Sequence, residues 1–163
     1  MPEAKSNILN QLIETDNLKR EVGSFNQSED VSRVVIFTQE KVKSSAPWTL
    51  DISQDIFMLS DSEKAKDISS IIDSINYLAK INADRNTLLI AYGGGSVSDH
   101  VGFIASIFKR GIKYINIPTT LVGMIDASIG GKTAINIDAL KNQIGTFYQP
   151  SKIFIDVNLM STM

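Results

Sequence analysis

The feature that most constrains the fold is a run of three glycines directly after an apolar segment. Residues 87–92 read TLLIAY, a run of strand length, and residues 93–95 are all glycine. A helical pattern follows from Val97. A strand that ends in a bare glycine loop and opens a helix exposes backbone amides that can approach a phosphate closely. This arrangement is typical of nucleotide-binding α/β folds.

The rest of the chain alternates strand and helix patterns. Strand patterns are compact at residues 33–38, 113–117 and 152–156, and weaker at residues 48–52 and 55–59. Helical patterns cover residues 8–22, 97–108 and 121–129, and the clearest follows Ser62, an expected N-cap, over residues 68–79. Residues 23–32 are polar, and we expect a loop there. The alternation predicts a three-layer, Rossmann-like α/β fold with a mostly parallel sheet and ligands at the carboxyl ends of its strands.

Composition excludes several classes of function. The 163 residues include one histidine and no cysteine, so neither a disulfide nor a His- or Cys-rich metal site is expected in this chain. The net charge is −2 and no apolar run reaches the length of a membrane span. We therefore expect a cytoplasmic protein without nucleic-acid or membrane partners.

Two glycine motifs only partly match known nucleotide-binding signatures. Residues 93–98 almost fit G-x-G-x-x-G, but Ser98 takes the place of the last glycine. Residues 130–133 read GGKT, like the end of a P-loop, but Asp126 stands where that motif needs its first glycine. A Walker-type site is therefore not expected, whereas Lys132, after two glycines, is a candidate phosphate-binding cation.

Further polar residues surround these motifs. Asp99 falls in the first turn of the predicted helix, where it can stabilise the helix dipole or accept a hydrogen bond from a ribose hydroxyl or a carboxamide. His100 is expected to be a side chain of the helix start rather than a catalytic base. Arg110, Lys141 and Asn142 add two cations and an amide suited to phosphate or hydroxyl contacts.

Taken in order, these segments resemble the 3-dehydroquinate synthase family. The resemblance runs from Val34 to the end of the chain and is most specific in RGIKYINIPTTLVGMIDASIGGKTAINIDALKNQIGTFYQPSKIFID. It implies an NAD-binding α/β domain at residues 34–163, with residues 1–33 as an N-terminal helical and loop segment of the same domain. The family's enzymes use NAD catalytically to convert 3-deoxy-arabino-heptulosonate 7-phosphate into 3-dehydroquinate and phosphate, a step of the shikimate pathway.

The resemblance also implies roles for individual residues. The cofactor contacts would be Asp61, Glu63, Lys66, Gly94, Gly95, Ser96, Val97, Ser98, Asp99, Thr119, Thr120, Lys132, Lys141, Leu159 and Thr162. The catalytic and substrate-binding residues would be Asp126, Lys132, Asn142 and Arg110. In this family the arginine reaches the phosphate site of a neighbouring subunit, which implies a homodimer.

The chain departs from the family pattern in three ways. Gln39 stands where the family commonly has an acid that binds the adenine ribose, Ser98 replaces a common glycine, and residues before Val34 lack the usual opening strand pair. The family's metal ligands, a glutamate and two histidines for zinc or cobalt, belong to a helical domain absent from these 163 residues. We therefore expect a fragment that does not turn over substrate alone.

Three alternatives remain open from the sequence. Iron-type alcohol and glycerol dehydrogenases share the GGGS-x-x-D loop, although residues 130–134 and 141–150 argue against them. Another sugar-phosphate cyclase would share the cofactor chemistry. A non-catalytic nucleotide-binding module would need only the glycine loop.

Overall fold

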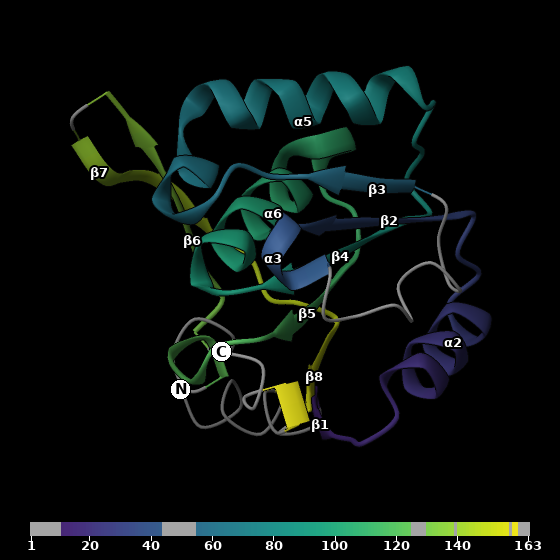
Figure 1. The fold of residues 1–163 in the computed structure, drawn as a ribbon. Helices are drawn as coiled ribbons and strands as arrows, with labels where there is room; N and C mark the ends of the chain where they lie inside the picture. The colour runs from purple at the N-terminus through teal and green to yellow at the C-terminus, as the bar shows by residue number, and fades with distance from the viewer. Residues whose placement is uncertain (1–10, 44–54, 125–129, 139, 157, 160–163) are drawn as a thin grey trace.

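The structure is a computed structural model that describes residues 11–43, 55–124, 130–138, 140–156 and 158–159. Its centre is a six-stranded sheet in the order β1-β8-β5-β4-β2-β3, and every pair of neighbours in it is parallel. The strands are β1 (Leu12–Glu14), β2 (Arg33–Thr38), β3 (Asp55–Met58), β4 (Thr87–Gly93), β5 (Tyr114–Pro118) and β8 (Lys152–Ile155). Figure 1 shows them fanned from β3 at the top to β1 at the bottom.

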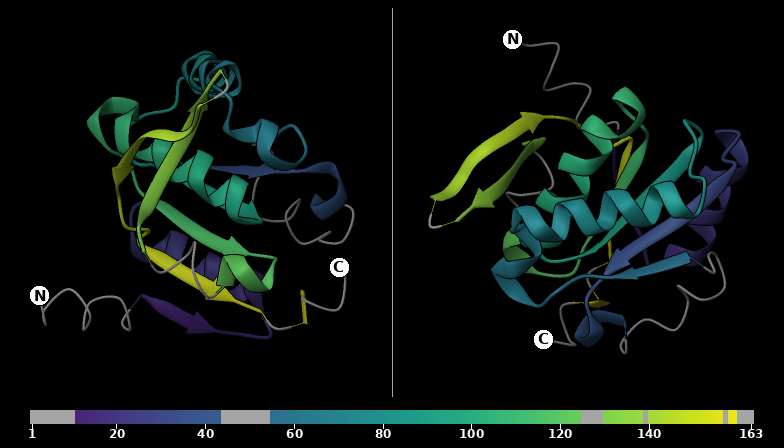
Figure 2. Two further views of the ribbon diagram at one scale, coloured as in Figure 1. Left: turned by 90° about the vertical axis from the view of Figure 1, so that its left-hand side faces the viewer. Right: turned by 90° about the horizontal axis from the view of Figure 1, so that it is seen from above.

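Helices cover both faces of this sheet, which makes three layers (Figures 1 and 2). On one face α5 (Ile68–Lys80) and α6 (Gly95–Ile107) bury Ile71 and Val101 against the sheet. On the other face α2 (Leu18–Ser28) packs Val22 against β4 and β5. All residues of β4 are buried, as expected for a central parallel strand with apolar side chains on both faces. The predicted fold class is confirmed.

Short helical segments connect these elements in the described part of the chain. They are α3 (Glu40–Lys43) after β2, the 3₁₀ turn η1 (Ser62–Lys66) before α5, and the 3₁₀ turn η2 (Phe108–Arg110) after α6. Gly111, the C-cap of η2, has φ of +116°, a conformation that favours glycine at this position.

A β-hairpin outside the main sheet was not predicted. Strands β6 (Lys132–Ile137) and β7 (Leu140–Phe147) pair antiparallel. The hairpin packs on α6, where a Cβ at Gly102 would lie 2.5 Å from Thr133 Cγ2. The absence of a side chain at this helical position therefore lets β6 approach the helix. Figure 2 shows the hairpin projecting beyond the ends of α5 and α6.

Several sequence predictions need correction. The helix expected over residues 8–22 is replaced, in its described part, by β1 and the start of α2, and the loop expected over residues 23–32 is largely helix. Ser62 begins η1, while α5 starts later with Asp67 as its N-cap. Residues 121–124 are helical, and the rest of the segment 121–129 lies outside the described residues, as does the strand predicted at 48–52. The other strands and the helix after the glycine loop are confirmed within one or two residues.

Candidate functional site: two cavities that share helix α6

The glycine loop lies at the carboxyl edge of the sheet, as predicted. Gly93 is aligned with Pro118 across β4 and β5, and the Thr119 amide donates to the Gly93 carbonyl at 2.9 Å. The amides of Val97 and Ser98 close the first turn of α6 on the Gly94 carbonyl. The amides that precede them in a helix have no intrahelical acceptor, so they form an anion-binding helix start.

The first cavity opens over this loop and has a volume of about 500 Å³. We call it the glycine-loop cavity. Its lining residues are Gln39, Lys41, Val42, Asp61, Ser62, Gly94, Gly95, Ser96, Thr119 and Thr120. A Cβ on Gly94 would lie 3.2 Å from Thr120 Cγ2, tighter than most side-chain contacts. The loop is therefore packed closely enough against residue 120 that a bare backbone suits this position.

Six of the predicted cofactor contacts meet in the glycine-loop cavity. They are Asp61, Gly94, Gly95, Ser96, Thr119 and Thr120. Sequence reasoning gave no cofactor role to Lys41, Val42 and Ser62, which also line it. Lys41 and Val42 follow β2, and their position after a strand next to the glycine-loop strand could have indicated them.

Other predicted cofactor contacts have side chains directed elsewhere. Val97 is fully buried in the core on the α5 and α6 side of the sheet. Ser98 donates its hydroxyl to Asn116 Oδ1 at 2.9 Å. Leu159 is buried in the core on the α2 side, and Lys141 is exposed on the hairpin. The small size of Ser98 still meets the requirement for close packing between helix and strand.

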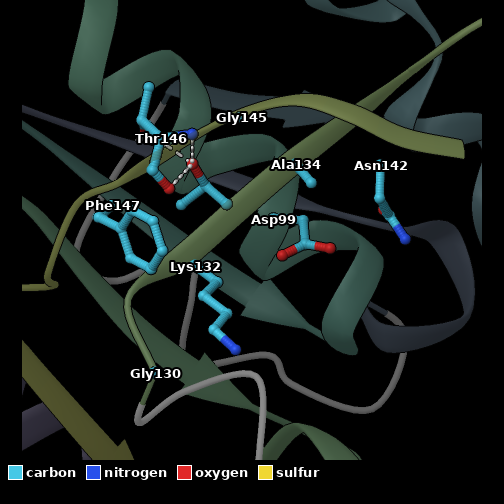
Figure 3. Close-up of a pocket in the computed structure, with 9 residues that line it drawn as sticks. Asp99, Gly130, Lys132, Ala134, Asn142, Gly145, Thr146 and Phe147 are labelled. Carbon is cyan, nitrogen blue, oxygen red and sulfur yellow. Dashed lines mark hydrogen bonds between the residues drawn. The ribbon is translucent and has the colours of Figure 1, made fainter.

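The second cavity lies between α6 and the hairpin and has a volume of about 530 Å³. We call it the hairpin cavity. Its lining residues are Asp99, Gly130, Lys132, Thr133, Ala134, Asn142, Gly145, Thr146 and Phe147. Figure 3 shows Lys132, Asp99 and Asn142 around the same hollow. Lys132 and Asn142, the predicted substrate contacts, are thus brought together with the predicted cofactor contact Asp99.

A buried lysine ties the hairpin cavity to the body of the molecule. The side chain of Lys66 is 5% exposed, and its Nζ lies 2.7 Å from Asp99 Oδ2 and 2.5 Å from Asn142 Oδ1. Glu63 lies further away, at 3.7 Å. Lys66 was expected to contact the cofactor, but in this structure its ammonium group holds two residues of the hairpin cavity in place.

Asn136, which sequence reasoning missed, completes this network. It is buried on β6. Its side-chain Nδ2 donates to Glu63 Oε1 at 3.0 Å, and its Oδ1 accepts from the backbone N–H of Asn142 at 3.1 Å. Asn142 itself has φ of +54°, a left-handed conformation that asparagine tolerates better than most residues. The backbone conformation that presents Asn142 to the cavity is therefore fixed by a buried side chain.

Burial changes the acid–base properties of two neighbouring residues on α6. Burial raises the pKa of Asp99 above its ordinary value, and the adjacent Lys66 ammonium opposes that change. Burial lowers the pKa of His100 to about 4. His100 lies in the core, with Nε2 2.8 Å from Ser74 Oγ and Nδ1 against the Ala65 carbonyl. His100 is thus a core side chain that links α6 to α5 and η1, and it lines neither cavity.

The remaining predicted residues are outside both cavities or outside the described chain. Arg110 is exposed after α6 with φ of +68°, and it lines neither cavity. Asp126 and Thr162 lie outside the described residues. Within the part of the chain that the structure describes, no three His, Cys, Asp or Glu side chains converge to hold a metal ion. The described helices include none that is long and apolar enough to cross a membrane.

Solved structures share this fold. A 2-deoxy-scyllo-inosose synthase superposes with a TM-score of 0.82 at 24% identity, covering 92% of this chain and 44% of its own. The 2-epi-5-epi-valiolone synthase of Streptomyces hygroscopicus subsp. jinggangensis, solved with NAD+ and Zn2+ bound, superposes with a TM-score of 0.78 at 26% identity. The superposition covers 93% of this chain and 44% of that protein. The fold therefore places the chain in the Rossmann-like class that includes the sugar-phosphate cyclases.

Within that class the sequence defines the family. The model described as 3-dehydroquinate synthase N-terminal matches residues 56–163, and the chain belongs to this family. The 3-dehydroquinate synthase of Sulfurisphaera tokodaii is 45% identical over 131 residues, which are 80% of this chain and 37% of that protein. The 3-dehydroquinate synthase of Dictyoglomus turgidum is 54% identical over 101 residues, which are 62% of this chain and 28% of that protein. The chain thus spans about a third of the length of these relatives.

Proposed function

We propose that this chain is the NAD-binding part of a 3-dehydroquinate synthase, an NAD-dependent carbon–oxygen lyase. The observation that carries the proposal is that one helix contributes to both cavities. Gly95 and Ser96 of α6 line the glycine-loop cavity, and Asp99, about one helical turn further on, lines the hairpin cavity. A dinucleotide in the first cavity and a phosphorylated substrate in the second would therefore be neighbours along α6.

The glycine-loop cavity has the chemistry that NAD needs. The first turn of α6 offers backbone amides for the pyrophosphate, and Gly94 keeps the loop free of a side chain against Thr120. Thr119 and Asp61 supply hydrogen-bonding groups in the lining of the same cavity. When bound, NAD supplies the hydride acceptor and donor for a temporary oxidation of the substrate.

The hairpin cavity has the chemistry that a phosphorylated sugar acid needs. Lys132 is an exposed ammonium group that can meet a phosphate dianion, and the Asn142 amide can donate to and accept from hydroxyl groups. Asp99 lies between them, and Lys66 keeps its carboxylate oriented. We propose that these residues bind 3-deoxy-arabino-heptulosonate 7-phosphate and exclude other orientations of it.

The proposal extends to assembly and metal. We propose a cytoplasmic homodimer in which the exposed Arg110 reaches the phosphate site of the second subunit, and in which Asp126 acts near the reacting ring. Among the described residues no three His, Cys, Asp or Glu side chains converge to hold a metal ion. We propose that residues outside this set bind the zinc or cobalt that the complete enzyme would use.

Calorimetric titration with NAD, followed by titration with the heptulosonate phosphate, tests the function. We expect saturable NAD binding that Gly94→Val abolishes, because the added branches collide with Thr120 and fill the cavity. Gly23→Val is the matched control, since a Cβ there meets nothing within 4 Å. Failure of the parent chain to bind NAD at millimolar concentration would refute the proposal. Binding of a different sugar phosphate in preference would reassign the substrate to another cyclase reaction.

A further inference from the structure

We infer that Lys66 is a positioning residue for the hairpin cavity. It turns the side-chain amide of Asn142 so that the amino group Nδ2 is the end left for a ligand. The inference rests on the proposed function, because it concerns how the same cavity holds its phosphorylated substrate. Lys66 does not itself line that cavity, so it acts through Asn142, which does.

The ammonium group of Lys66 determines which end of the Asn142 amide faces it. An amide group can turn by about 180° with little change of shape, so its hydrogen-bond partners decide where its oxygen and its nitrogen point. An ammonium group donates hydrogen bonds and accepts none. The atom of Asn142 that lies 2.5 Å from Lys66 Nζ is accordingly the carbonyl oxygen Oδ1. The opposite orientation would place two donors against each other.

Burial makes this orientation costly to reverse. The side chain of Lys66 is almost fully buried, and its Nζ also contacts Asp99 Oδ2 at 2.7 Å, while Glu63 Oε1 lies at 3.7 Å. A buried ammonium group that loses an oxygen partner carries an uncompensated desolvation cost. Asn142 Oδ1 therefore stays directed at Lys66 before any ligand arrives.

The backbone of Asn142 is fixed at the same time. Its N–H donates to Oδ1 of the buried Asn136 at 3.1 Å, and its φ is +54°. With the backbone and the side-chain oxygen both held, the amide is oriented in advance of binding, which lowers the entropy cost of a contact to it. No residue in the described part of the chain accepts a hydrogen bond from Nδ2, so this amino group is available to a ligand.

An amino group fixed in this way recognises a hydrogen-bond acceptor. Asn142 and Lys132 lie around the same hollow (Figure 3), and the oxygens of a phosphate group can accept from both. Lys66 also pairs with Asp99, whose carboxylate would otherwise oppose an anion in this cavity. Removal of Lys66 would free the amide to turn its oxygen towards the phosphate, so that an attractive contact becomes a repulsive one.

Nuclear magnetic resonance of the side-chain amides tests the orientation. The Nδ2 resonance of Asn142 is identified by its loss in Asn142→Ala. We expect it to shift when heptulosonate phosphate or inorganic phosphate is added to the parent chain, to shift equally in Lys64→Met, an exposed site of the same turn, and to stay unmoved in Lys66→Met. Lys66→Arg, which keeps a cationic donor, should retain part of the shift. An equal shift in Lys66→Met would overturn the inference.

A double-mutant cycle by calorimetry separates orientation from loss of charge. We expect Lys66→Met to weaken heptulosonate phosphate by about tenfold in the parent chain but by about threefold or less in the Asn142→Ala background, where there is no amide to orient. Equal losses in both backgrounds would overturn the inference and leave the proposed function intact. Absence of binding of both phosphates by the parent chain would refute the proposed function together with the inference.

Asn142→Asp tests the same point without removing the buried lysine. The aspartate keeps one oxygen on Lys66 and places a second oxygen where Nδ2 lies. We expect this variant to unfold in urea no more easily than the parent chain, because Lys66 gains an anionic partner, and to bind heptulosonate phosphate about tenfold more weakly. Retention of the parent affinity in the folded variant would overturn the inference.

Discussion

Acidification should destabilise the folded chain through His100. This residue is the one histidine of the sequence, is fully buried, and has a pKa of about 4 against an ordinary value of 6.5. Between these two values the unfolded chain binds a proton that the folded chain does not. Above pH 6.5 His100 is neutral in both states and does not change the free energy of unfolding. As the pH falls from 6.5 towards 4, the unfolded chain takes up the proton first, and the free energy of unfolding decreases progressively.

The size of the effect follows from the same two pKa values. Each pH unit in that interval costs up to about 1.4 kcal/mol, so lowering the pH from about 7 to about 5 should remove about 2 kcal/mol of unfolding free energy. Asp99 has the opposite sign, since its raised pKa lets the folded state take up a proton first. Protonation of Asp99 therefore cannot account for a loss of stability on acidification.

Urea unfolding followed by circular dichroism at these two pH values measures the effect. We expect His100→Gln to be less stable than the parent chain at neutral pH, because its contacts to Ser74 and Ala65 change. It should nevertheless lose about 2 kcal/mol less on acidification, since its side chain does not titrate. Equal losses in the two proteins would refute the argument that burial keeps His100 neutral.

Three further substitutions test the packing and the hairpin cavity. Lys66→Met should cost about 3 kcal/mol of unfolding free energy, because it leaves Asp99 without its buried partner. Lys64→Met, at an exposed site of the same turn, is the control, and an equal cost in both variants would contradict the network around Lys66. Gly102→Ala should destabilise by about 1–2 kcal/mol in urea unfolding through collision with Thr133, whereas an alanine at Gly23, in open space on α2, should be neutral or stabilising. Lys132→Ala should weaken binding of the heptulosonate phosphate at least tenfold by calorimetry while leaving NAD affinity within twofold; a loss confined to NAD would contradict its role at the phosphate.

The central strands and the glycine loop could be predicted because their signals are local. Residues 87–92 combine an apolar run of strand length with three following glycines, and the structure ends β4 at Gly93. The N-terminal region could not be predicted in this way. β1 is only three residues long and depends on its distant partner β8, and α2 runs through the polar residues after Gly23 that favour a loop.

The hairpin shows a different reason for failure. The motif GGKT suggests a phosphate loop around the lysine, and the only alternation of apolar and polar residues in β6 is the short run Ile135–Ile137, a weak strand signal. The role of Lys66 could not be seen at all, because its contacts to Asp99 and Asn142 join residues 33 and 76 positions apart. Only the tertiary structure brings these side chains together.

The pairing of β1 with β8 has a consequence for the order in which the chain folds. Ile13 is aligned with Phe154, so this edge of the sheet joins segments about 140 residues apart in sequence. On a ribosome β1 must wait until β8, which ends at residue 155, has been synthesised before it has this partner. The interior strands β2, β4 and β5 can associate earlier, since they lie between residues 33 and 118. We therefore expect closure of the β1 edge to be a late event, because contacts between distant segments bear the largest cost of loop closure.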